Sequence, residues 1–168
     1  MDFSELVVKR YSVRAYKPDM VEEEKLQKAL EAARLAPTAA NHQPFRIFVV
    51  HTKGKETDFK KMYSREWFTQ APVVICFCIE PAKAWVRSDG LNYAIVDATI
   101  AASNFILAAT ELGLGTCWIG AFNPLEVRKF FNLGKELEPL FLIPVGYPAD
   151  KPAKKIRKSM QEIVSYLD

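Results

Sequence analysis

The fold is indicated most strongly by two short segments, RYSVR at residues 10–14 and PTAANHQP at residues 37–44. The first segment carries Arg10, Ser12 and Arg14 at alternate positions, so an extended backbone would direct these three side chains to one side. Arginine presents a fork of N–H donors that matches the oxygens of a phosphate. The second segment is a polar turn that offers an amide side chain and backbone groups to a flat heteroaromatic ligand. Together the two segments indicate a phosphorylated cofactor.

Two further segments could contribute to the same site. A second basic cluster comes late in the chain and consists of Lys154, Lys155, Arg157 and Lys158. By itself this cluster is better explained as a solvated face before a last helix, but a bound phosphate would account for both clusters. Residues 113–122, GLGTCWIGAF, place Gly120 and Ala121 just after an expected strand. These small residues let a planar ligand approach the backbone, although a plain helix cap, strand and turn explain the segment equally well.

The composition is that of an ordinary soluble globular protein, with 168 residues, 49% of them hydrophobic and 26% charged. We expect a single domain over residues 1–168. The net charge of +3 is spread over cations interleaved with 20 acidic residues, so no nucleic-acid role is expected. The first residues, MDFSEL, resemble no signal peptide, and no apolar run approaches the roughly 20 residues that cross a bilayer. We therefore expect a cytoplasmic protein without a membrane role.

Three cysteines support a reducing compartment, because an odd number leaves at least one free thiol. Cys76 and Cys78 lie in an apolar run, where we expect buried structural thiols rather than a metal site. His42 and His51 are the only histidines. Neither has the partners of a Ser-His-Asp site, and no metal site is expected.

The pattern of apolar residues predicts alternating helices and strands. Strands are expected over residues 45–50, 73–79, 116–119 and 140–145, and helices over residues 2–9, 22–36, 56–63, 93–112 and 124–131, with a final amphipathic stretch over 160–167. Taken alone, this alternation suggests a doubly wound parallel sheet. The sequence contains neither G-x-G-x-x-G nor G-x-x-x-x-G-K-[ST], so side chains and scattered amides must hold any phosphate. Asp97, within the apolar helix, fits either a buried, paired carboxylate or an interface contact and is assigned no catalytic role. The aromatic residues Trp67, Phe68, Trp85 and Tyr93 fit either the core or a substrate pocket.

The motifs and their order resemble the nitroreductase family of FMN-dependent oxidoreductases. The similarity begins with R-x-S-x-R, continues after one helix with A-P-T-x-x-N-x-Q-P, and has Phe45 where Trp is frequent in the family. Residues 97–120 are similar to the family's central helix and following strand, and residues 144–148 with 155–158 are similar to its closing motif. The resemblance covers nearly the whole chain in the right order.

The resemblance implies an α+β fold in which helices flank a central, mostly antiparallel sheet, in place of the parallel sheet. It also implies an intertwined homodimer with two FMN molecules at the subunit interface. By analogy with the family's motifs, the phosphate would lie near the two basic clusters, and Arg14 would lie near the N1/O2 edge of the flavin ring. The turn at residues 37–41 would contact the flavin of the other subunit. The backbone amide of Gly120 or Ala121 would face flavin N5. The implied cofactor-binding residues are Arg10, Tyr11, Ser12, Arg14, Pro37, Thr38, Ala39, Asn41, Ile119, Gly120, Ala121, Lys155 and Arg157.

The activity implied by the resemblance is FMN-dependent oxidation of NADH or NADPH, followed by reduction of nitroaromatic or quinone-type acceptors in a ping-pong mechanism. The flavin does the chemistry, so no protein acid or base is expected. Two alternatives stay open: a reductive dehalogenase or flavin-fragmenting enzyme of the same fold, and a flavin-binding redox protein without efficient turnover. The chain is shorter than many relatives. It leaves open the physiological acceptor, the choice between NADH and NADPH, and the residues that line the substrate pocket.

Overall fold

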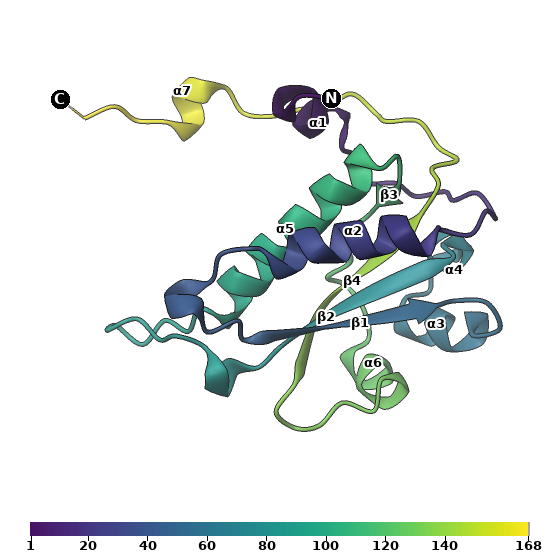
Figure 1. Cartoon of the computed structure of the whole chain (residues 1–168), viewed down its shortest axis with the longest axis horizontal. Helices are drawn as coiled ribbons and strands as arrows, with labels where there is room; N and C mark the ends of the chain where they lie inside the picture. The colour runs from purple at the N-terminus through teal and green to yellow at the C-terminus, as the bar shows by residue number, and fades with distance from the viewer. Residues whose placement is uncertain (168) are drawn as a thin grey trace.

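A computed structural model describes residues 1–167 and contains one four-stranded antiparallel sheet (Figure 1). The spatial order is β1-β2-β4-β3, in which the strands are β1 (Phe45–His51), β2 (Val73–Ile79), β3 (Gly115–Thr116) and β4 (Glu138–Gly146). All three pairings are antiparallel. The antiparallel sheet implied by the family resemblance is thereby confirmed, and the parallel sheet suggested by the alternation of elements is wrong. The physical reason is that His51 pairs with Val73, so the helices between β1 and β2 return the chain to the end of the sheet that it left.

Helices cover both faces of this sheet. The described chain contains the helices α1 (Phe3–Lys9), α2 (Glu23–Arg34), α3 (Glu56–Met62), α4 (Glu66–Gln70), α5 (Ala94–Glu111), α6 (Pro124–Phe130) and α7 (Met160–Ile163), with short 3-10 turns at Ala39–Asn41 and Pro81–Lys83. The α2 and α5 helices lie together on one face, and α3, α4 and α6 gather at the other (Figure 1). The chain after β4 passes α1 as an extended segment before it reaches α7.

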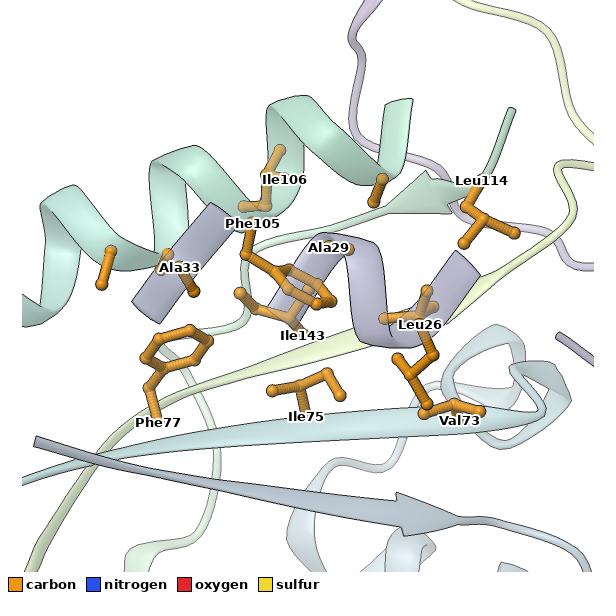
Figure 2. Close-up of a cluster of buried hydrophobic side chains, with 14 of the residues drawn as sticks. Leu26, Ala29, Ala33, Val73, Ile75, Phe77, Phe105, Ile106, Leu114 and Ile143 are labelled. Carbon is orange, nitrogen blue, oxygen red and sulfur yellow. The ribbon is translucent and has the colours of Figure 1, made fainter. Parts of the chain in front are cut away.

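The core is built around β2, which is buried at all seven positions. Alternate side chains point to opposite faces of a strand. Val73, Ile75 and Phe77 therefore meet α2 and α5, where Figure 2 shows them facing Leu26 and Phe105. The intervening residues Val74, Cys76 and Cys78 enter the second cluster, beneath α3 and α6. Both thiols are free and fully buried, which confirms the prediction of structural cysteines.

The α5 helix is the longest element and has two apolar faces. Ala98, Ala101 and Phe105 are fully buried within the chain, whereas Ile95 and Ile100 are exposed. Within the described residues, α5 alone is long and apolar enough to cross a membrane, but half of it is buried here as a core helix. Its exposed apolar face is the part that this chain leaves uncovered.

Three local expectations differ from the structure. The strand expected over residues 116–119 is wrong in its extent, because β3 covers only Gly115–Thr116 and Ile119 forms a separate bridge with Leu142. The α4 helix was not expected, since its five residues are too few to show a helical period. The last amphipathic stretch forms only the short α7, because its apolar side chains find no core within the described chain.

Candidate functional site

A hollow of about 320 Å³ lies where the two basic segments of the sequence meet. We call it the basic pocket, and the residues that line it are Arg10, Tyr11, Ser12, Arg14, Asp150, Lys151, Ala153, Lys154, Lys155, Ile156 and Arg157. Six of these side chains are cations and one is a carboxylate. The fold therefore brings together two segments that are about 140 residues apart in the sequence.

The N-terminal wall of the pocket is held by backbone hydrogen bonds to the sheet. The Val13 N–H donates to the carbonyl of Thr116 at 2.9 Å, and the Ala149 N–H donates to that of Ala15 at 2.9 Å. A Cβ atom at Gly115 would lie 2.5 Å from Val13 Cγ2, so only glycine permits this close approach. Tyr16 is buried behind the wall, and its hydroxyl donates to the Val13 carbonyl at 3.1 Å. The segment is thus fixed, with Arg14 exposed to the pocket.

The single carboxylate of the pocket was not found from the sequence. The Tyr11 hydroxyl donates to Asp150 Oδ1 at 3.0 Å and is equally close to the Asp150 carbonyl oxygen. The Arg14 N–H donates to Asp150 Oδ2 at 2.7 Å. Burial, reinforced by the Asp150 carboxylate, raises the pKa of Tyr11 to about 12. The only available signal was an acidic residue at the head of an otherwise basic segment.

Lys155 connects the late basic segment to the end of α1. Its Nζ donates to the Val7 carbonyl at 2.8 Å and also to that of Val8, within the last turn of the helix. A cation is favourable at that end of a helix. Burial first, and then the charges of Arg10 and Arg157, lower the pKa of Lys155. The cations of the pocket therefore repel one another, and a bound anion would relieve that repulsion. This observation and the set of donors fit a phosphate group.

The turn after α2, residues 37–43, lies away from the basic pocket and has a strained backbone. Ala40, Asn41 and Gln43 have φ angles of 49°, 59° and 50°, in a region that residues other than glycine seldom adopt. The Ala39 N–H donates to Asp97 Oδ1 at 2.9 Å, and the Gln43 N–H donates to Thr38 Oγ1 at 3.2 Å. Pro37 and Asn41 in this turn are exposed, and Thr38 and Ala39 are half-buried. The backbone of the turn is therefore displayed at the surface.

The structure does not bring this turn to the basic pocket of the same chain. The turn is bound to Asp97 at the start of α5, whereas the pocket adjoins Thr116, a few residues beyond the end of α5. A helix of 18 residues is about 27 Å long at 1.5 Å per residue. The two groups of expected cofactor-binding residues thus lie near opposite ends of α5.

The third expected segment presents free backbone donors. Ile119 is buried and exchanges two backbone hydrogen bonds with Leu142, at 2.9 and 3.0 Å. Gly120 and Ala121, which follow it, are exposed. Among residues 1–167 their N–H groups donate to no protein acceptor, and a Cβ atom on Gly120 would meet nothing within 4 Å. This segment could therefore donate hydrogen bonds to a ligand that approaches its backbone.

The four aromatic residues considered for a substrate pocket are separated in the fold. Phe68 is fully buried against Phe59 in the core, so it is a structural residue. Trp85 and Tyr93 are half-buried and stack edge to face with their centroids 4.9 Å apart, near the start of α5. Trp67 packs on Tyr63, on the other face of the sheet. The structure does not gather them into one pocket.

The fold and the basic pocket define an α+β protein with a strongly cationic hollow beside strand β3 of its sheet. Residues 7–63 and 53–147 match the family model described as "Nitroreductase family". The chain therefore belongs to the nitroreductase family.

Curated relatives and solved structures agree with this assignment. A Methanothermobacter thermautotrophicus protein, described as a candidate NADH dehydrogenase/NAD(P)H nitroreductase, is 31% identical over 92% of this chain and 82% of that protein. The FMN reductase [NAD(P)H] of Bacillus subtilis is 31% identical over 90% of this chain and 68% of that enzyme. A crystal structure of a nitroreductase family protein from Clostridium difficile has a TM-score of 0.90 and 39% identity, covering 99% of this chain and 98% of that one. The protein is an oxidoreductase of the NAD(P)H nitroreductase and FMN reductase type.

Proposed function

We propose that this protein is an FMN-dependent NAD(P)H oxidoreductase whose basic pocket binds the phosphate of FMN. One observation carries the proposal: two basic segments far apart in the sequence converge on one hollow that is lined by six cationic side chains. Arg10, Ser12, Lys155 and Arg157 would hold the phosphate, with Tyr11 beside them. Family membership implies a flavin and a nicotinamide, and the Bacillus subtilis relative is named an FMN reductase.

The position of the strained turn supports a site shared between two copies of the chain. The turn lies near the start of α5 and the pocket lies near its end, and the helix is about 27 Å long, so one chain does not surround a flavin with both. A second copy could supply Pro37, Thr38, Ala39 and Asn41. The exposed apolar side chains of α5 and of the last amphipathic stretch are the surfaces that a partner would cover. We therefore propose an intertwined homodimer in which residues 1–168 of each copy act as one FMN-binding domain.

When bound, the flavin would supply hydride chemistry, first with NADH or NADPH and then with a nitroaromatic or quinone-type acceptor. The protein's own contribution is binding and electrostatics. Arg14 would provide a positive charge that favours the reduced, anionic flavin ring. The free amides of Gly120 and Ala121, next to buried Ile119, would donate hydrogen bonds to the ring. This division of labour requires no catalytic acid or base from the protein. Three free, buried thiols fit the reducing cytoplasm in which we place the enzyme.

The experiment combines cofactor analysis with turnover. The purified protein is denatured, the released flavin is identified by chromatography, and oxidation of NADH and NADPH is measured with and without menadione. We expect FMN to be released and menadione to accelerate the oxidation of the nicotinamide. Release of FAD, or failure to bind any flavin after reconstitution, would contradict the proposal. Stoichiometric FMN without turnover would instead identify a flavin-binding redox protein.

A further inference from the structure

Asp150 occupies an unexpected place for an acidic residue, because it lines the pocket in which we propose that a phosphate binds. Both oxygens of its carboxylate accept hydrogen bonds from the protein itself. One oxygen accepts from the Tyr11 hydroxyl at 3.0 Å, and the other accepts from the Arg14 N–H at 2.7 Å. The carbonyl oxygen of Asp150 also lies 3.0 Å from the Tyr11 hydroxyl. Asp150 is therefore bound to the N-terminal wall of the pocket at three points.

These contacts are the last hydrogen bonds between two extended segments, residues 11–17 and residues 147–150. Before Asp150 the segments pair through their backbones, since the Lys17 N–H donates to the Tyr147 carbonyl and the Ala149 N–H donates to the Ala15 carbonyl, each at 2.9 Å. The Arg14 N–H has no backbone acceptor in the described chain and uses the Asp150 carboxylate instead. Beyond Asp150 the chain runs on to Lys155, which reaches α1.

Without these ties, the two walls would be joined only by the backbone pairing that ends at Ala149 and by the Lys155 contact with α1, so the stretch between Ala149 and Lys155 would be held less firmly. Arg10 and Ser12 belong to the N-terminal wall, and Lys155 and Arg157 belong to the segment that follows Asp150. Convergent charged donors bind an anion well only when their geometry is held before binding, because ordering them at the moment of binding costs free energy. Asp150 joins the walls inside the pocket itself, so it should affect how well the phosphate donors of the two walls act together.

We propose that Asp150 is a positioning residue for the phosphate site, which ties the two basic walls together through Tyr11 and the Arg14 amide without contacting the phosphate. This inference rests on the proposed function.

A purely electrostatic role for Asp150 and a positioning role predict opposite changes in FMN affinity when the residue is replaced, which makes the inference testable. Replacement of Asp150 by Asn removes a negative charge beside six cations, so a purely electrostatic effect would tighten the binding of FMN. Loss of the ties would instead weaken it. Riboflavin has the same ring without the phosphate, so it reports any change in the rest of the site.

The test compares dissociation constants for FMN and riboflavin, measured by quenching of flavin fluorescence, in the wild-type protein and in Asp150→Asn. A matched control is Asp19→Asn, which removes the same charge from an exposed carboxylate outside the pocket. We expect Asp150→Asn to weaken FMN binding by roughly tenfold, the scale of one hydrogen bond to a charged group, and to leave riboflavin binding within about twofold of wild type. Tyr11→Phe keeps the charge and loses only the hydroxyl, so it should weaken FMN selectively as well. It serves as the test if Asp150→Asn does not fold.

Unchanged or tighter FMN binding in Asp150→Asn would overturn the inference. So would an equal loss of FMN and riboflavin, which would indicate a general structural role. If the wild-type protein itself binds FMN and riboflavin equally, the phosphate site of the proposed function fails, and the role of Asp150 fails with it.

Discussion

The buried carboxylate of Asp97 accepts a hydrogen bond from the Ala39 N–H at 2.9 Å, across 58 residues of sequence. Asp97 is 1% exposed and lies in the first turns of α5, which is the longest helix of the core. Ala39 opens the turn that contains Ala40, Asn41 and Gln43, all with positive φ. The core helix thereby holds a strained surface turn that we expect to contact the flavin of a partner subunit.

Asp97→Ala should destabilise the protein, because the Ala39 N–H loses its acceptor. The expected decrease in the free energy of unfolding is about 1–3 kcal/mol. Asp97→Asn keeps a carbonyl oxygen that can accept this bond and should cost less. Urea unfolding of the two variants measures the difference. Identical unfolding midpoints for wild type and both variants would show that the contact does not stabilise the turn.

Arg10→Ala and Arg157→Ala should each weaken FMN binding by about 1.5–3 kcal/mol, the range for a hydrogen bond to a charged group. Both side chains line the basic pocket, whereas Lys53 is exposed and does not line it. Lys53→Ala is therefore the control, and titration calorimetry of the apoproteins with FMN is the measurement. The same affinity in all three variants would refute the assignment of the phosphate site.

The raised pKa of Tyr11 predicts a specific loss of stability in alkali. The folded protein holds the pKa at about 12, against an ordinary value of 10.0, because burial and the Asp150 carboxylate oppose the tyrosinate. A raised pKa contributes stability that is fully present below pH 10 and is lost as the pH rises through about 12. Between these pH values the stability of the wild-type protein should therefore fall more steeply than that of Tyr11→Phe. Parallel curves of urea midpoint against pH would contradict this expectation.

A charge on the uncovered face of α5 should impair dimer formation and flavin binding together. Ile100 is 36% exposed and belongs to that face, so Ile100→Glu leaves the internal core intact, whereas the neighbouring Ala101 is fully buried within the chain. A shared site links dimer formation to flavin binding, so the variant should show weaker dimer formation in sedimentation and weaker flavin binding in a titration. Leu125→Glu, at an exposed apolar residue on α6, is the matched control. A wild-type monomer that is stable and saturated with flavin would exclude the shared site.

The sequence predicted those features that depend on local pattern. The central strand β2 and its buried thiols follow from an apolar run, and the two basic segments were visible as clusters of Arg and Lys. The direction of the strands was available only through the family resemblance, because the alternation of helices and strands does not say at which end of the sheet a helix returns the chain. The sequence allowed a buried, paired carboxylate at Asp97 but could not name its partner, and it gave no sign of the contacts of Asp150, because the partners lie 58 and 136 residues away and no local spacing reports such contacts.

The central claim is that the basic pocket binds the phosphate of FMN, and the most direct test is the ratio of the dissociation constants of the wild-type apoprotein for riboflavin and FMN. Two or more charged hydrogen bonds to the phosphate predict that FMN binds at least about a hundredfold more tightly. High salt should reduce this preference, because the pocket acts through charge. Equal affinities for the two flavins would contradict the account.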